Sequence, residues 1–121
     1  MTINPKLLEP TLLWANSNPA NDFVTQGVTL SPKATDFRYV VIQWAYWKEW
    51  AGLNLTKMAV AKTSNVTVML SGQNQQASEY ISRGVYITNT GDMFFEACKR
   101  NGNNGADGFI VPIAIYGTNI L

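Results

Sequence analysis

The sequence of this chain predicts an all-β fold, a jelly-roll-like sandwich of about eight short antiparallel strands. Apolar and polar residues alternate over short segments that are rich in Val, Ile, Thr and aromatic residues. Clusters of Asn, Ser, Gly and Pro separate these segments, and no helical period persists. The length of 121 residues fits one domain. We therefore expect a single sandwich over residues 1–121, with residues 1–10 as an extended N-terminal arm.

Eight segments carry the strand pattern, and turn-forming residues bound each of them. In chain order, the expected strands are residues 12–14, 23–30, 36–47, 54–61, 65–70, 80–88, 93–99 and 109–116. The longer polar loops are expected at residues 16–22, 71–78 and 100–108.

The segment at residues 36–47 gives the strongest strand signal, because both of its alternating faces are apolar. We expect it to be central, with one face in the core and the other against a loop, a ligand or another subunit. Two later segments leave alternatives open. Residues 92–100 also fit a helix, but the turn signal at residues 89–91 favours a returning strand. Pro112 in the last segment predicts either an edge strand or a local bulge.

Low charge limits the classes of partner. Charged residues make up 14% of the chain, against a usual value of about 25%, and the net charge is +1. The basic residues are scattered, and only Lys99 and Arg100 are adjacent, so the sequence predicts no nucleic-acid partner. A polar surface with few charges suits neutral polar ligands and close packing between subunits.

The cysteine count and the apolar runs exclude further classes. Cys98 is the only cysteine, which rules out an intrachain disulfide and a zinc site built on cysteines. Residues 1–10 contain no apolar core of a signal peptide, and no apolar run approaches the ~20 residues of a membrane span. We therefore expect no signal peptide and no membrane partner.

Catalytic chemistry has little support in the sequence. The chain contains no histidine, which is the commonest general base and the usual nitrogen ligand of metal sites. It contains no phosphate-binding glycine motif and no calcium loop. A glycosidase needs two carboxylates that face each other across a cleft, and nothing in the sequence indicates such a pair. We expect a protein that is not an enzyme and that uses no cofactor and no metal.

The residues that suggest ligand binding are aromatic and concentrated in one segment. Trp44, Tyr46, Trp47 and Trp50 fall within seven residues, and Trp50 lies past the expected strand end. Aromatic faces stack on sugar rings, while amide and carboxylate groups bind the hydroxyls. The alternative is that Trp44 and Trp47 contact the core or another subunit, although their opposite parity prevents both from facing one core. The candidate ligand-binding residues are Trp50, Trp47, Tyr46, Asn74, Gln75, Asn103, Asn104 and Asp107.

Arg83 stands out because it shares a strand face with Ile81, Val85 and Ile87. An arginine on an apolar face needs a partner. We expect a structural ion pair, either with Glu96 on the next strand or with a carboxylate of a neighbouring subunit.

Short motifs at both ends of the chain resemble a small domain of phage and prophage tail proteins. The opening motif is Leu13-Trp14-Ala15-Asn16, followed by Phe23-x-x-Gln26-x-Val28-x-Leu30 and by the aromatic strand at residues 37–47. The closing motif, Pro112-x-x-Ile115-Tyr116-Gly117, is the most specific. The chain departs from the pattern in residues 44–50, which are richer in tryptophan than such domains.

The resemblance implies a β-sandwich module of tail fibres, baseplates or minor structural proteins, often trimeric, at the host-contacting end of a virion. We therefore expect a non-enzymatic tail-associated module that forms a homotrimer, contacts other tail proteins and binds a host cell-surface saccharide. Its expected location is the virion tail, or the host cytoplasm before assembly. The alternative is a purely structural assembly or capping protein with no ligand.

Overall fold

The computed structural model describes residues 10–48, 53–60, 67–74 and 78–120. In this part of the chain, ten β-strands form two antiparallel sheets that pack together. The expected all-β sandwich is confirmed, with ten strands instead of the expected number of about eight. The one helical turn in these residues is η2, a 3-10 turn at Ala34–Asp36. No helix among them is long and apolar enough to cross a membrane.

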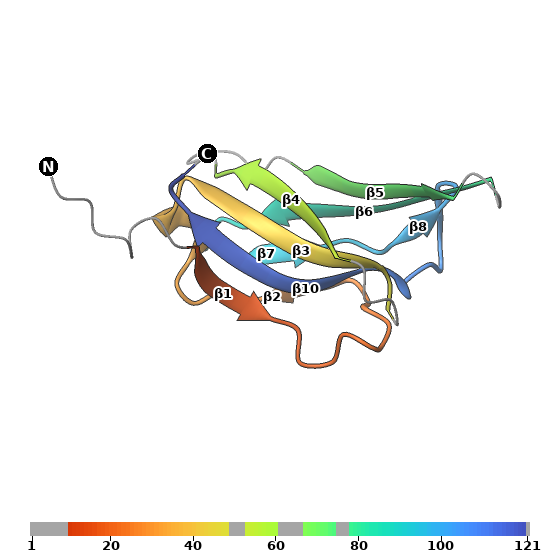
Figure 1. The fold of residues 1–121 in the computed structure, drawn as a ribbon, viewed down its shortest axis with the longest axis horizontal. Helices are drawn as coiled ribbons and strands as arrows, with labels where there is room; N and C mark the ends of the chain where they lie inside the picture. Colours follow the sequence, from red (N-terminus) through yellow and green to blue (C-terminus); the bar gives the residue numbers. More distant parts are fainter. Residues whose placement is uncertain (1–9, 49–52, 61–66, 75–77, 121) are drawn as a thin grey trace, which may run out of the picture.

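The first sheet contains four strands, which Figure 1 shows side by side. Their order is β1 (Thr11–Ala15), β10 (Phe109–Thr118), β3 (Tyr39–Trp47) and β4 (Asn54–Ala59). The first and the last strand are therefore neighbours, as suits a jelly-roll-like arrangement. The long strand β3 is paired along both of its edges, which confirms its expected central position in the sheet.

The second sheet is built around β6 (Glu79–Ile87). β5 (Val68–Asn74) pairs with one edge of β6, while β7 (Met93–Phe95) and β8 (Lys99–Arg100) pair with the other. β2 (Gln26–Val28) extends the sheet beyond β7, and β9 (Asn103–Asn104) extends it beyond β8.

The core lies between the two sheets and follows from the alternation of side chains along each strand. On β3, Val40, Ile42 and Trp44 are buried, and on β6 the alternate residues Ile81 and Val85 face them from the other sheet. Each sheet thus turns one face inward. The opposite face of β3 is not covered by the second sheet, and its residues are partly exposed except for Ala45, which is buried.

β5 is longer than the sequence indicates. We expected a strand at residues 65–70 and a polar loop at residues 71–78, but β5 continues to Asn74 and pairs with residues 79–82 of β6. Polar residues remain in the strand because the long neighbour β6 offers a continuous row of backbone partners. Asn74 is therefore the last residue of a strand and does not lie in a loop.

The strand expected at residues 93–99 is interrupted, because β7 ends at Phe95 and Lys99 belongs to the next strand, β8. At the interruption, the Arg83 side chain binds the Glu96 carbonyl and the Asp107 side chain binds the Cys98 amide, which removes both groups from the sheet ladder. The helix considered for this segment is not formed.

Two local expectations about turns and bulges are confirmed. The turn at residues 89–91 closes with a hydrogen bond of 3.0 Å from the Gly91 amide to the Thr88 carbonyl. Pro112 lies on β10, which has neighbours on both sides, so the edge alternative is wrong. The pairing register with β3 shifts between Pro112 and Ala114, which is the bulge alternative.

The loop expected at residues 100–108 contains a hairpin that was not expected. β8 and β9 are joined by Asn101 and Gly102, which have φ angles of 50° and 85°. Positive φ at both turn residues is the geometry that Asn-Gly favours in two-residue hairpins. The Asn-Gly dipeptide was therefore the available signal for this element.

Arg83 is fully buried and binds backbone carbonyls. Its Nη1 donates to Glu96 O (2.8 Å), its Nε to Ile110 O (2.9 Å) and its Nη2 to Phe109 O (3.1 Å). The carboxylate that faces it belongs to Asp107, with 3.8 Å between Nη2 and Oδ1. The expected ion pair with Glu96 is wrong, because that side chain covers a glycine on the outer face of the sheet.

Candidate functional site

Six of the eight candidate ligand-binding residues lie in the described part of the chain, while Trp50 and Gln75 lie outside it. The structure brings the six to one end of the sandwich, where β3 ends, β6 begins and β8 pairs with β9 (Figure 1, right). We call this region the aromatic end, after the rings of Tyr46, Trp47 and Phe109. The six candidates are Tyr46, Trp47, Asn74, Asn103, Asn104 and Asp107.

Phe109 joins the two candidate rings. Its ring centroid lies 5.4 Å from that of Tyr46 and 4.7 Å from that of Trp47, both in edge-to-face geometry. The Arg100 guanidinium lies 5.0 Å from the same ring centroid. Neither Phe109 nor Arg100 was a candidate from the sequence, because their proximity to β3 depends on the pairing of β10 with β3.

The rings of Tyr46 and Trp47 each lie over the backbone of a glycine residue. A Cβ atom at Gly72 would lie 2.7 Å from the Tyr46 ring, and one at Gly108 would lie 2.8 Å from the Trp47 ring. Lys48 Nζ lies 5.2 Å from the Trp47 ring centroid. The rings therefore fill space above glycines, and both remain only partly exposed.

The polar residues of the aromatic end differ in exposure. Asn103 and Asn104 form β9 and are exposed to solvent. Asn74 is paired in register with Glu79, whose Oε1 lies 3.4 Å from Nε of Arg100. The two exposed asparagines thus stand beside an ion pair and an aromatic cluster, which together offer amide groups, a cation and an apolar surface.

Asp107 is used by the fold. Its Oδ1 accepts a hydrogen bond from the Cys98 amide (3.1 Å) and faces the buried Arg83. The Asp107 backbone carbonyl accepts a hydrogen bond from the Phe23 amide (2.8 Å). The Asp107 carboxylate, which the sequence suggested for ligand binding, is therefore already used in contacts within the fold.

Two titratable groups near the aromatic end have shifted pKa values. Burial raises the pKa of Tyr46, and the negative charge of Glu79 raises it further. Burial raises the pKa of Cys98 to about 11, so the thiol stays protonated at neutral pH and is a poor nucleophile. Among the residues that the structure describes, no three His, Cys, Asp or Glu residues gather in a way that could hold a metal ion.

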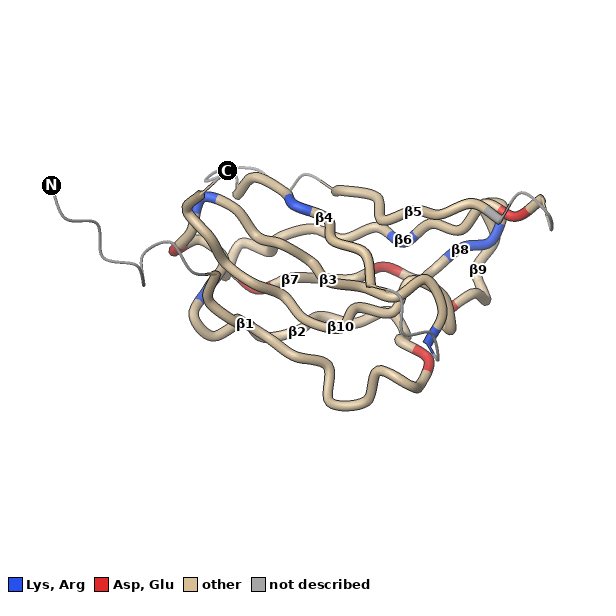
Figure 2. Tube along the Cα trace, viewed as in Figure 1, with Lys and Arg blue, Asp and Glu red and all other residues tan. Residues whose placement is uncertain are grey.

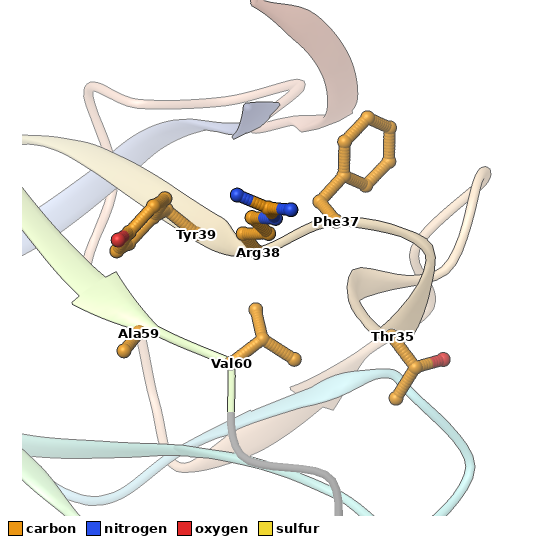
Figure 3. A pocket seen from close by; sticks show the side chains of 6 residues that line it. All are labelled: Thr35, Phe37, Arg38, Tyr39, Ala59 and Val60. Carbon is orange, nitrogen blue, oxygen red and sulfur yellow. The ribbon is translucent and has the colours of Figure 1, made fainter. Parts of the chain in front are cut away.

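A hollow of about 290 Å³ lies at the opposite end of the sandwich, near the start of β3. Figure 3 shows the Arg38 guanidinium between the side chains of Phe37 and Tyr39. The lining residues are Thr35, Phe37, Arg38, Tyr39, Ala59 and Val60. Sequence reasoning did not select this hollow; its one signal was an arginine that leads an otherwise apolar strand face.

The outer face of the four-stranded sheet is apolar. We define this outer face by the row Leu12, Tyr116, Val41 and Lys57, which the strand registers align across the sheet, and by Leu55 in the next row. A shallow hollow of about 320 Å³ opens on it, lined by Pro10, Val41, Gln43, Leu55 and Tyr116.

Charge is nearly absent from this sheet. Lys57 is the only charged residue on its four strands. In Figure 2, β1, β3 and β10 carry no blue or red segment within their strands, while β4 carries a blue one. The sequence of β4 identifies that residue as Lys57. Leu55 is 68% exposed and Leu12 is 50% exposed. The sheet thus presents aliphatic side chains to solvent, with Lys57 as the one charged residue on its strands.

Comparison of the chain with protein-family models, with curated proteins and with solved structures gives no significant match.

Proposed function

We propose that this chain is a non-catalytic structural module of a phage or prophage tail, and that it works by packing against other copies of itself through the outer face. The observation that carries the proposal is the exposed aliphatic surface on a sheet with one charged residue. The core of a protein interface is typically depleted of charge and enriched in aromatic and aliphatic groups. The tail context rests on the motifs described under sequence analysis.

The size of the face suits an interface. With strands about 4.8 Å apart and a rise of about 3.3 Å per residue, four strands present a footprint of roughly 500 Å². A specific interface buries about 800 Å² on each partner, so the face and its margins provide most of that area. Single exposed apolar residues are common on monomers, but a contiguous patch marks an interaction site.

A second copy of the chain is the partner that this surface suits best. Lys57 lies on β4, at the edge of the sheet, so it can stay in water while Leu12, Val41 and Tyr116 are covered. A closed ring such as a homotrimer buries such surfaces without open-ended growth. The ion pairs of Asp22, Glu79, Asp92 and Asp107 with basic residues also support a structural use of the carboxylates.

Replacing Leu55 with lysine is expected to weaken self-association at least tenfold. The substitution removes aliphatic area from the interface and places a second cation two residues from Lys57 on the same strand face, and each 1.4 kcal/mol of cost lowers the association constant tenfold. Leu55 is 68% exposed, so the fold should be unaffected. Light scattering over a concentration series measures the change.

The matched control is Met69→Lys. Met69 is 49% exposed on the outer side of the second sheet, so the substitution adds the same charge elsewhere. It should leave the mass of the wild-type assembly unchanged. A wild-type protein that is monomeric at high micromolar concentration would contradict the proposed function.

A second candidate function is binding of a cell-surface saccharide at the aromatic end. The observation that favours it is the gathering of Asn103, Asn104 and the partly exposed Trp47 ring at one end of the sandwich. Several weak sites per assembly would add avidity on a repetitive polymer.

The double substitution Asn103→Ala and Asn104→Ala is expected to weaken glycan binding about tenfold with little change in thermal stability, because both residues are exposed. A glycan array followed by calorimetry measures the effect. Asn89→Ala, an exposed asparagine in the turn after β6, serves as the control. A wild-type protein that binds no glycan and no cells would remove this candidate.

A further inference from the structure

Arg38 differs from the other arginines of the described chain in its lack of an acidic partner. Arg83 and Arg100 each have a carboxylate oxygen within 4.0 Å. Within the described ranges, Arg38 forms no such ion pair, and it is exposed at the mouth of the hollow of about 290 Å³. An exposed guanidinium in a hollow with apolar walls is a ready site for an anionic group.

The walls of this hollow are fixed by contacts with the rest of the fold. The Arg38 amide donates to Asn119 Oδ1 (2.9 Å), and the Val60 amide donates to the Arg38 carbonyl (2.8 Å). The Phe37 ring covers Gly117, where a Cβ atom would lie 2.5 Å from it. A binding surface held in this way loses little entropy when a ligand arrives.

The donors that remain for a ligand come from side chains. Two backbone amides beside the hollow, those of Arg38 and Val60, are already used, so a peptide gains no strand partner from them. The hollow instead offers one guanidinium, the hydroxyl-bearing side chains of Thr35 and Tyr39, and apolar surface from Phe37. This combination suits a ring-shaped ligand with an apolar face, several hydroxyls and one carboxylate.

We propose that the hollow around Arg38 binds a hexuronic acid residue of an acidic polysaccharide. The carboxylate accepts two hydrogen bonds from the Arg38 guanidinium, and the sugar ring lies against Phe37 and Tyr39. The volume of about 290 Å³ accommodates one sugar ring. This site is distinct from the aromatic end, and it goes beyond the proposed assembly function.

Lys57 adds a second cation beside this site. Its Nζ lies 5.0 Å from the centroid of the Tyr39 ring, which also lines the hollow. In a polymer of uronic acids, the adjoining residue carries a second carboxylate that Lys57 can meet. Binding should therefore strengthen from the monosaccharide to the disaccharide and fall as ionic strength rises.

The test is an NMR titration of the labelled protein with digalacturonic acid and with its methyl ester, which has the same rings without the charge. We expect the acid to bind at least tenfold more tightly than the ester, with the largest shifts at the amides of residues 37–39. Arg38→Gln should lower the affinity for the acid at least tenfold. Arg38→Lys should recover part of the loss, since lysine keeps the charge but not the fork of donors.

Lys99→Gln is the matched control, because it removes one exposed charge from β8, away from the hollow. Equal binding of the acid and the ester, or equal losses for Arg38→Gln and Lys99→Gln, would overturn the proposal. Preferential binding of an acetylated dipeptide with a free carboxyl terminus, compared with its amide, would replace the saccharide with a peptide. The titration does not depend on the oligomeric state, so it can fail or succeed separately from the assembly proposal.

Discussion

Replacing Arg83 with methionine is expected to lower the free energy of unfolding by about 3–5 kcal/mol. The substitution keeps a long apolar stem but removes every donor. The carbonyls of Glu96, Phe109 and Ile110 would lose their guanidinium partner, and the Asp107 carboxylate would lose the cation that faces it. Buried acceptors that are left without partners cost about 1–3 kcal/mol each.

The backbone next to Arg83 adds to this cost. Ile110 has a φ of 46°, a left-handed conformation that β-branched residues rarely adopt. Arg83 binds the carbonyl of Ile110 and that of Phe109 before it, and so holds this conformation in place. Without the guanidinium, the start of β10 has less to keep it in register with β3.

Urea unfolding measures the effect of Arg83→Met as a shift of the midpoint. Arg83→Lys should recover part of the loss, because one ammonium group cannot reach all the carbonyls that the planar guanidinium binds. Lys99→Met, at an exposed position on β8, should change stability by less than about 0.5 kcal/mol. A loss below 1 kcal/mol for Arg83→Met would contradict the structural role described above.

Replacing Trp44 with alanine is expected to cost about 3–5 kcal/mol of folding free energy. The Trp44 side chain is 6% exposed and belongs to the core between the sheets. Its Nε1 donates to Thr56 Oγ1 at 2.9 Å, which joins β3 to β4 through side chains. Alanine would leave a large cavity and an unpaired hydroxyl.

Thermal unfolding distinguishes the two contributions. Trp44→Phe keeps most of the apolar volume and loses the hydrogen bond, so its cost should be about 1–2 kcal/mol. Trp47→Ala should cost less than Trp44→Ala, because the Trp47 ring is only partly buried. If the Trp44→Ala and Trp47→Ala variants unfold at the same temperature, the assignment of Trp44, but not Trp47, to the core is wrong.

The parts of the fold that could be predicted from sequence are those set by side-chain alternation. The two faces of β3 follow from such a pattern, and so does its central place in the sheet. The end of β5 could not be predicted, because residues 71–74 are polar and stay in the strand only through pairing with β6. The sequence around Pro112 was compatible with an edge strand and with a bulge, and only the observed strand pairing shows that it is a bulge.

The candidate site could be predicted only where it depends on local sequence. Asn103 and Asn104 are exposed polar residues, as their glycine-rich surroundings suggest. The partners of Arg83 could not be predicted in this way. The sequence indicated that this arginine needs partners, but most of the atoms that bind it belong to residues 107–110. These residues lie far from Arg83 in the sequence and approach it only when β10 takes its place in the fold. The same holds for the contact between Phe109 and the rings of Tyr46 and Trp47.

The two edges of the four-stranded sheet are each protected against a further strand. On β1, the Leu13 carbonyl already accepts the amide of Ser31 at 3.1 Å, so part of that edge is closed by a loop of the same chain. On β4, Lys57 places a charge on the last strand, and lysine on an edge strand opposes sheet extension. Copies that pack through the outer face, as proposed, would therefore gain little from also joining their edge strands. The same protection of the edges opposes the growth of cross-β fibrils, which requires open strand edges.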